Sequence, residues 1–297
     1  MSTDHSRRDL NRPLLGLALG FVGVVIFGAT LPATRVALTG FDPAFITFGR
    51  AFLAGLASGL VFLVARKRFP RGDLAAFAMI GATLVFGFPG FVNVAMQTVP
   101  ASHGGIVLGV LPLLTAVFAA LIGGERPGPA FWLWGVAGAA LVLAFTLRGG
   151  GIDPGIGHVW LLFAAVVSAF GYVVSGKLAR HLPGWEVIAW TLVLCLPLTG
   201  LGSLWAWAVG GVHAPPVAAI WALAYLAFGS MFAGFFFWNA GLAMGGIARV
   251  GQVQLLQTFV TLSISAVLLG EEITPIMLAF ACAVAAVVWL GRKARVG

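Results

Sequence analysis

Apolar segments separated by short polar or glycine- and proline-rich connections fill almost the whole chain from residue 14 to residue 291. Many of these segments approach the roughly 20 residues that an α-helix needs to cross a bilayer. The connections between them, such as Pro70-Arg71-Gly72 and Pro215-Pro216, are too short to hold a soluble domain. The pattern therefore predicts an all-α polytopic membrane protein with ten transmembrane helices. We place them at about 14–33, 44–64, 75–95, 103–123, 130–148, 157–176, 186–208, 217–238, 247–269 and 275–291.

Two stretches of the chain, 93–129 and 239–275, align without a gap at an offset of 146 residues. Eight of the 37 aligned positions are identical, where so glycine-, alanine- and leucine-rich a chain would give roughly three or four by chance. The polar markers keep their spacing, with Asn93 aligned to Asn239 and Gly-Glu closing both stretches. We therefore predict two homologous halves of five helices each.

The two predicted halves cover residues 14–148 and 157–291. Because five is an odd number, the second half must enter the membrane upside down relative to the first. An inverted repeat is typical of alternating-access transporters, in which the pathway lies near the midplane where the halves meet.

Composition and charge agree with this arrangement. Of the 297 residues, 60% are hydrophobic and 9% are charged, and the mean hydropathy is +1.04, which excludes an ordinary soluble protein. If the N-terminus is cytoplasmic, the inner segments hold 14 of the 17 Lys and Arg residues, the outer loops hold Arg35 and Arg148, and Arg50 lies within a helix. The positive-inside rule then predicts that both termini are cytoplasmic and the helix count even. It also explains the net charge of +8 without a nucleic-acid partner.

Ten helices in two five-helix repeats, each with Gly-Glu after its fourth helix, resemble the drug/metabolite transporter superfamily, which is built from paired EamA-type domains. Phe27-Gly28-Ala29-Thr30 in the first helix and Gly49-Arg50-Ala51-Phe52 in the second are similar to that family's pattern. Within the superfamily, the chain is most similar to bacterial inner-membrane exporters of amino acids and metabolites. The resemblance implies a central cavity formed by the first, third, fourth, sixth, eighth and ninth helices.

The ninth helix has the most polar face. At helical spacing it presents Gln254, Gln257, Thr258, Thr261 and Ser265 on one side. The aligned positions of the fourth helix are almost wholly apolar and include a proline that predicts a kink, Pro112. Such polar residues commonly form hydrogen bonds between membrane helices, and that interpretation stays open. The asymmetry between the halves favours a role in lining the substrate pathway.

The eighth helix carries an aromatic face that ends at Trp238 and Asn239. These side chains could simply pack among helices and lipid, or they could form a cavity wall in which Asn239 binds a polar group. Asn93 and Gln97 form a matching line on the third helix, and Tyr172 lies on a polar face of the sixth. The candidate substrate-binding residues are therefore Asn93, Gln97, Tyr172, Trp238, Asn239, Gln254 and Gln257.

Charged residues are scarce inside the predicted helices. Arg50 could pair with a substrate carboxylate, although the favoured interpretation is that it extends outward to water. Glu125 and Glu271 follow the fourth helix of each half and suit the positive N-terminal end of the next helix. No Asp or Glu lies in the interior of a predicted helix, so the usual intramembrane carboxylate of an ion-coupled carrier is missing.

Motifs of ATPases, metalloproteases and serine hydrolases are also missing from the sequence. We therefore predict a transporter rather than an enzyme, with no cofactor and no metal. The leading hypothesis is an inner-membrane carrier that exports small metabolites, with neutral or aromatic amino acids as the expected substrates. Efflux of apolar cationic drugs is the first alternative, and an intramembrane enzyme is a remote one. The sequence leaves the oligomeric state open.

Overall fold

The computed structural model describes residues 3–70, 72–123, 128–148, 155–245, 250 and 253–293. Helices dominate this part of the chain, and its one β-bridge pairs Phe41 with Val212. In chain order the helices are α1 (Thr3–Gly28), α2 (Thr30–Ala37), α3 (Pro43–Val64), α4 (Leu74–Ile80), the π-helical η1 (Gly81–Gly87), α5 (Phe88–Ala95), α6 (Ala101–Leu108), α7 (Leu111–Gly123), α8 (Pro129–Arg148), α9 (Ile156–Leu178), α10 (Gly184–Ala208), α11 (Val217–Ala224), the π-helical η3 (Tyr225–Gly234), α12 (Phe235–Gly245), α14 (Leu256–Leu269) and α15 (Pro275–Lys293).

Several helices follow one another directly in the chain and together form membrane-length spans. Within the described residues, seven spans are long and apolar enough to cross a membrane: Leu14–Ala37, Pro43–Val64, Leu74–Ala95, Ala101–Ile122, Ile156–Leu178, Gly184–Ala208 and Val217–Leu242. Three shorter apolar helices fall on the remaining predicted ranges: Trp132–Phe145, Leu256–Leu269 and Pro275–Gly291. Helices suit this composition because they satisfy every backbone polar group without water. The predicted all-α polytopic membrane protein is confirmed.

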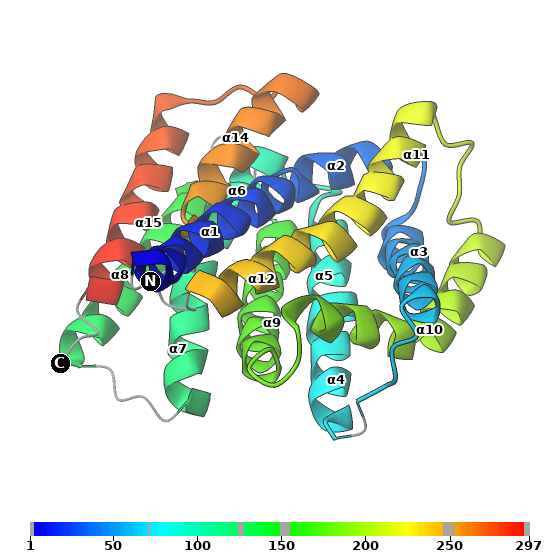
Figure 1. Cartoon of the computed structure of the whole chain (residues 1–297). Coiled ribbons are helices and arrows are strands. Elements are labelled where there is room, and N and C mark those ends of the chain that lie inside the picture. The colour runs from blue at the N-terminus through cyan, green and yellow to red at the C-terminus, as the bar shows by residue number, and fades with distance from the viewer. Residues whose placement is uncertain are drawn as a thin grey trace.

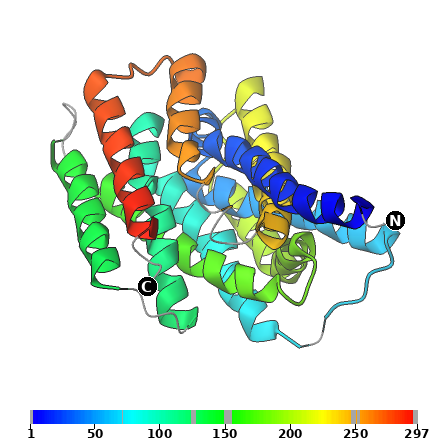
Figure 2. The same ribbon diagram turned by 60° about the vertical axis from the view of Figure 1, so that its left-hand side comes forward.

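Many contacts between the helices come in matching pairs: where a helix of the first half contacts one of the second half, the corresponding helices with the halves exchanged are also in contact. α1 packs against α12 as α9 packs against α5, and α1 packs against α14 as α9 packs against α7. The second helices of the two halves, α3 and α10, contact each other, as do the last helices, α8 and α15. These two pairs lie at opposite edges of the molecule, with α1, α12, α5 and α9 between them (Figure 1). The turned view again places α8 beside α15 (Figure 2).

Both halves have a π-helical segment in their third span. At the offset of 146 residues, Gly81–Gly87 corresponds to 227–233, which lies inside η3. In the first half, Pro89 follows the segment and cannot donate the α-helical hydrogen bond to Val85, which favours a local widening of the helix. π-Helical turns often occur at functional sites, where they redirect side chains. Here both segments face the centre of the molecule.

The fourth span is interrupted between Leu108 and Leu111, which confirms the kink predicted from Pro112. Proline lacks the N–H that would bond to the carbonyl of Leu108. In the second half the corresponding position is Thr258, yet Gln254 and Leu255 also form a turn immediately before α14. The interruptions therefore lie at matching places in the two halves, although only one of them has a proline to cause it.

Helix α3 is held against α10 at both ends. Near its start, the backbone N–H of Asp42 donates to the carbonyl of Gly211 (2.9 Å), and His213 Nε2 lies 2.9 Å from Asp42 Oδ1. Beyond its other end, Lys67 Nζ donates to Glu186 Oε1 (2.7 Å). Because α3 carries Arg50, these contacts also fix the position of that residue.

Candidate functional site

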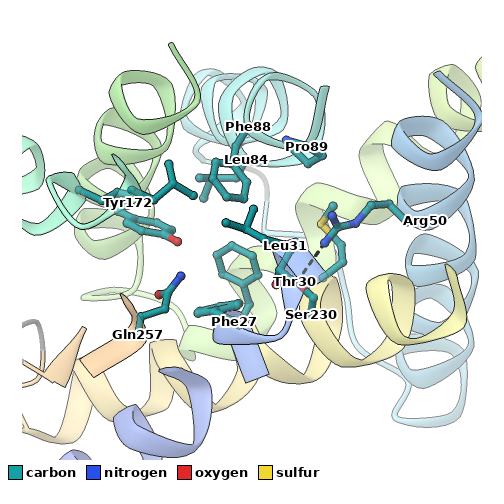
Figure 3. A pocket seen from close by; sticks show the side chains of 14 residues that line it. Phe27, Thr30, Leu31, Arg50, Leu84, Phe88, Pro89, Tyr172, Ser230 and Gln257 are labelled. Atoms are coloured by element: carbon teal, nitrogen blue, oxygen red, sulfur yellow. Dashed lines mark hydrogen bonds between the residues drawn. The ribbon is translucent and has the colours of Figure 1, made fainter. Parts of the chain in front are cut away.

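A small cavity lies at the centre of the bundle, where the interrupted helices meet (Figure 3). Its lining comes from the first, second, third, fourth, sixth, eighth and ninth predicted helices, which is the set implied by the family resemblance with the second helix added. The lining residues are Phe27, Thr30, Leu31, Arg50, Leu84, Phe88, Pro89, Leu108, Leu111, Tyr172, Ser230, Met231, Phe235 and Gln257. A neighbouring cavity shares Leu31, Leu108, Leu111 and Gln257 and adds Gly105, Gln254, Thr258 and Thr261.

Aligned positions of the two halves line these cavities, but their chemistry differs. Leu84 aligns with Ser230, Leu108 with Gln254, and Leu111 with Gln257 at the offset of 146. The first half thus contributes leucines where the second contributes a hydroxyl and two amides. The lining of the cavities therefore combines apolar and polar side chains, as expected for a ligand with both kinds of group.

Arg50 points into the cavity rather than outward, so the prediction that it extends to water is wrong. The residue is only 2% exposed, and its Nη2 donates to Ser230 Oγ at 3.0 Å. Ser230 Oγ also lies 2.8 Å from Thr30 Oγ1, which links three helices at this point (Figure 3). Nε and Nη1 of Arg50 find no hydrogen-bond partner among the described residues. The physical reason is that α3 packs against η3, which leaves this side chain no path to the surface.

Tyr172 and Gln257 lie on the side of the cavity opposite Arg50 (Figure 3). The Gln257 Oε1 atom is buried and has no hydrogen-bond partner in the described part of the chain. Gln254, 6% exposed, lies in the neighbouring cavity. Three of the seven predicted binding residues are therefore brought together near the centre.

Asn93 and Asn239 do not line either cavity, because their amides bond to neighbouring helices. Asn93 Nδ2 donates to Thr47 Oγ1 (2.8 Å) and, more weakly, to the carbonyl of Pro43 (3.4 Å). Asn239 Nδ2 donates to the carbonyl of Gly184 (2.9 Å). Pro43 and Gly184 are the first residues of α3 and α10, so the aligned asparagines make matching contacts in the two halves. This is the interhelical role that paired polar residues often have in membranes.

We expect Asn239→Ala to lower stability while leaving transport per folded molecule close to that of the unmodified protein. One interhelical hydrogen bond in a membrane protein contributes about 1 kcal/mol, so the melting temperature in detergent should fall measurably. The matching change Asn93→Ala should behave in the same way. A tenfold loss of transport at an unchanged melting temperature would instead place Asn239 in the substrate site.

The two remaining predicted residues also lie outside the central lining. Gln97 is exposed and lines a separate open groove between α3 and α5. Trp238 is 3% exposed and packs against Phe27 and Tyr172, with ring centroids 6.3 and 6.4 Å apart. Trp238 thus supports two lining residues from behind. Of the aromatic face in the eighth span, Phe235 reaches the cavity, whereas Phe228 and Phe236 are 45% and 40% exposed at the surface.

Glu271 interacts with a different helix from the one predicted. It caps a helix N-terminus, as expected, but the helix is α6 rather than the next one in the chain. Its carboxylate accepts hydrogen bonds from the backbone N–H groups of Ala101 (2.9 Å) and Ser102 (2.8 Å), where the helix dipole favours a negative charge. The carboxylate therefore joins the end of the ninth span to the start of the fourth. Glu125 lies outside the described residues.

The central cavity has a volume of about 20 Å³. This is room for about one water molecule and far too little for a metabolite. Within the described residues there is no cluster of three or more His, Cys, Asp or Glu that could hold a metal ion.

Comparison with known proteins identifies the family. The EamA-like transporter family model matches the chain twice, at residues 14–147 and 155–291. This chain belongs to the EamA-like transporter family, and it is a multi-pass membrane transporter rather than an enzyme.

The chain is also similar to individual relatives. It is 43% identical over 270 residues, 89% of this chain and 92% of the relative, to the uncharacterized transporter YdeK of Bacillus subtilis (strain 168). It is 28% identical to a probable terminal-alkyne amino-acid exporter of Streptantibioticus cattleyicolor, covering 86% of both chains. It is 28% identical to the aromatic amino acid exporter YddG of Ancylobacter novellus, covering 78% of this chain and 81% of that protein. A crystal structure with 24% identity matches 96% of this chain and 98% of its own at a TM-score of 0.64, which shows the fold alone.

Arg50, Thr30 and Ser230 are cavity residues that the sequence-based assignment omitted. The sequence contained one usable signal for them, since Arg50 is the one Lys or Arg more than three residues from the ends of a predicted helix and an intramembrane charge marks a functional site by default. Ser230 had no such signal, because it lies among aromatic and small residues in a segment whose π-helical turn cannot be anticipated from periodicity.

Proposed function

We propose that this protein exports small amino-acid-like metabolites by alternating access through the central cavity. The observation that carries the proposal is the cavity itself: it lies where interrupted helices of both halves meet, and its lining combines apolar and polar side chains. Transporters commonly bind substrate at such helix breaks near the midplane. The candidate substrate-binding residues are Tyr172, Gln254 and Gln257, joined by Arg50, Thr30 and Ser230.

The proposed architecture is ten transmembrane helices in two inverted repeats, 14–148 and 157–291. Three observations support it: the gapless alignment at an offset of 146, the exchange-symmetric helix contacts, and the double match to one family model. The inner membrane of a bacterium is the proposed location, with both termini in the cytoplasm. The distribution of Lys and Arg supports this orientation.

Labelling of single cysteines in intact cells checks the orientation. We expect cysteines placed in 66–71, 177–181 and the C-terminal tail to be protected from a membrane-impermeant maleimide. Cysteines in 149–155 and 209–216 should react. Termini on opposite sides of the membrane would overturn both the even helix count and the inverted repeat.

Amino acids are favoured over apolar cationic drugs, which remain the alternative substrate class. Two relatives are named amino-acid exporters. In addition, the described residues that line the central cavity include an arginine and no Asp or Glu, so a cationic drug would meet a positive charge there and no negative charge to pair with.

Flux through the purified protein in liposomes tests the function. We expect vesicles loaded with labelled leucine or phenylalanine to release it faster when they contain the protein than when they contain none. A set of aliphatic, aromatic and charged amino acids, with a cationic dye as comparison, defines the substrate class. Dye flux without flux of any amino acid would reject the proposed function in favour of drug efflux.

A further inference from the structure

We infer that the guanidinium of Arg50 is the receptor for a substrate carboxylate, so that the cargo is a zwitterion or a monocarboxylate with an apolar body. This inference rests on the proposed function and assigns its substrate chemistry. It starts from a buried cation that has no counter-charge paired with it among the described residues.

The burial of Arg50 is the first step in the argument. A charged group that leaves water is costly unless a counter-ion or hydrogen bonds replace its hydration. Arg50 is 2% exposed, and among the described residues its guanidinium makes one hydrogen bond, to Ser230 Oγ at 3.0 Å. Nε and Nη1 have no partner. A structural arginine would be expected to have its charge paired, whereas a binding arginine must keep donors free for its ligand.

The position of those donors is the second step. Arg50 lines the central cavity, and the Thr30–Ser230 contact fixes the one hydroxyl to which it is bonded. Contacts at both ends of α3 hold its backbone in place. An anion that enters the cavity therefore meets a guanidinium already oriented, which reduces the entropy lost on binding. Carboxylates match the planar donor fork of arginine.

The opposite side of the cavity supplies the complementary groups. Gln257 Oε1 is an acceptor with no partner among the residues that the structure describes, and Tyr172 lies beside it in the lining (Figure 3). An amide oxygen and a phenol oxygen can accept hydrogen bonds from a substrate ammonium group. Between the two polar ends stand apolar side chains, among them Phe27, Leu31 and Leu84. A small amino acid with an apolar side chain would satisfy all three regions at once.

Competition in reconstituted liposomes tests the inference on the unmodified protein. Flux of labelled leucine is measured against unlabelled leucine, its deaminated analogue 4-methylpentanoate, leucinamide and leucinol. We expect leucine to inhibit strongly, 4-methylpentanoate to inhibit measurably, and leucinamide and leucinol to need at least about tenfold higher concentrations. Equal inhibition by leucine and leucinamide would overturn the inference, although leucine flux itself would still support the proposed function.

A variant pair separates binding from folding. We expect Arg50→Gln to lose most leucine flux and to lower the leucine-to-leucinamide preference toward one, while Arg50→Lys retains part of both. The matched control is Arg35→Gln, since Arg35 donates to the carbonyl of Met96 (2.8 Å) away from the cavity; it should keep the preference. Preference is a ratio within one protein sample, so partial loss of folded protein does not change it. An unchanged preference in Arg50→Gln would overturn the inference and assign Arg50 a structural role only. Absence of any amino-acid flux in the unmodified protein would instead reject the proposed function itself.

Discussion

Gln257→Leu is expected to reduce amino-acid transport by at least about tenfold. The substitution copies the first half, where Leu111 occupies the aligned position, and it removes an amide from the side of the cavity opposite Arg50 (Figure 3). It removes a buried carbonyl oxygen that has no partner within the described structure and is therefore available to a substrate ammonium group. A hydrogen bond to a charged group contributes about 1.5–3 kcal/mol, which corresponds to roughly tenfold to hundredfold in rate or affinity.

The measurement is leucine flux in liposomes together with the melting temperature in detergent. The melting temperature should stay within a few degrees or rise, because replacing an unsatisfied buried polar group by an apolar one of similar size is close to neutral. Ser263→Ala on the same helix is the matched control, since Ser263 is exposed and donates to the carbonyl of Phe259 within its own helix (2.9 Å). Normal transport by Gln257→Leu, with failure of variants at Leu108 or Leu111, would place the pathway along the fourth span instead.

Gly241→Ala is expected to prevent most of the protein from folding. A Cβ at this position would lie 2.7 Å from the backbone nitrogen of Gly20 and 2.8 Å from the carbonyl oxygen of Gly16. These are backbone atoms of a packed helix, so α1 and α12 would have to move apart along the contact that carries Phe27 and Trp238. Small residues allow such close approach between membrane helices, and overpacking typically costs about 1–3 kcal/mol or more.

Gly135→Ala in α8 is the control for this prediction, because a Cβ there would meet no atom within 4 Å among the described residues. It should be neutral or slightly stabilising, since alanine favours a helix by about 1 kcal/mol over glycine. The yield of monodisperse protein and its melting temperature measure both variants. Equal behaviour of the two variants would mean that the α1–α12 contact tolerates separation, contrary to the geometry.

Much of the helical architecture was predictable because a bilayer imposes strong rules on sequence. A span of roughly 20 apolar residues has few alternatives to a helix, and the observed helices fall on the predicted ranges. Pro112 predicted the interruption of the fourth span because the effect of proline on a helix is local. The matching interruption before α14 was not predicted, because no proline or glycine marks it.

The candidate site was predictable only in part. Gln254 and Gln257 line the central cavities, as predicted from the polar face that they share on the ninth helix. The asparagines looked equally suitable, yet Asn239 bonds to Gly184 on a helix that begins 55 residues earlier. Helical periodicity shows which side chains share a face, but it does not show which carbonyl groups lie opposite that face.

By itself, the sequence determined the class of this protein: apolar segments of membrane length, a repeated pattern of polar markers, and positive charge on one predicted side. These features depend on the residue pattern along the chain and on the uniform apolar environment of the bilayer. They can therefore be recognised without knowing the tertiary structure. The tertiary structure alone decided that Arg50 faces inward, that Ser230 holds it, and that the asparagines serve helix packing. Each of these outcomes depends on contacts between helices distant in the chain, and in a low-dielectric interior those contacts decide whether a polar group is satisfied or left free to bind.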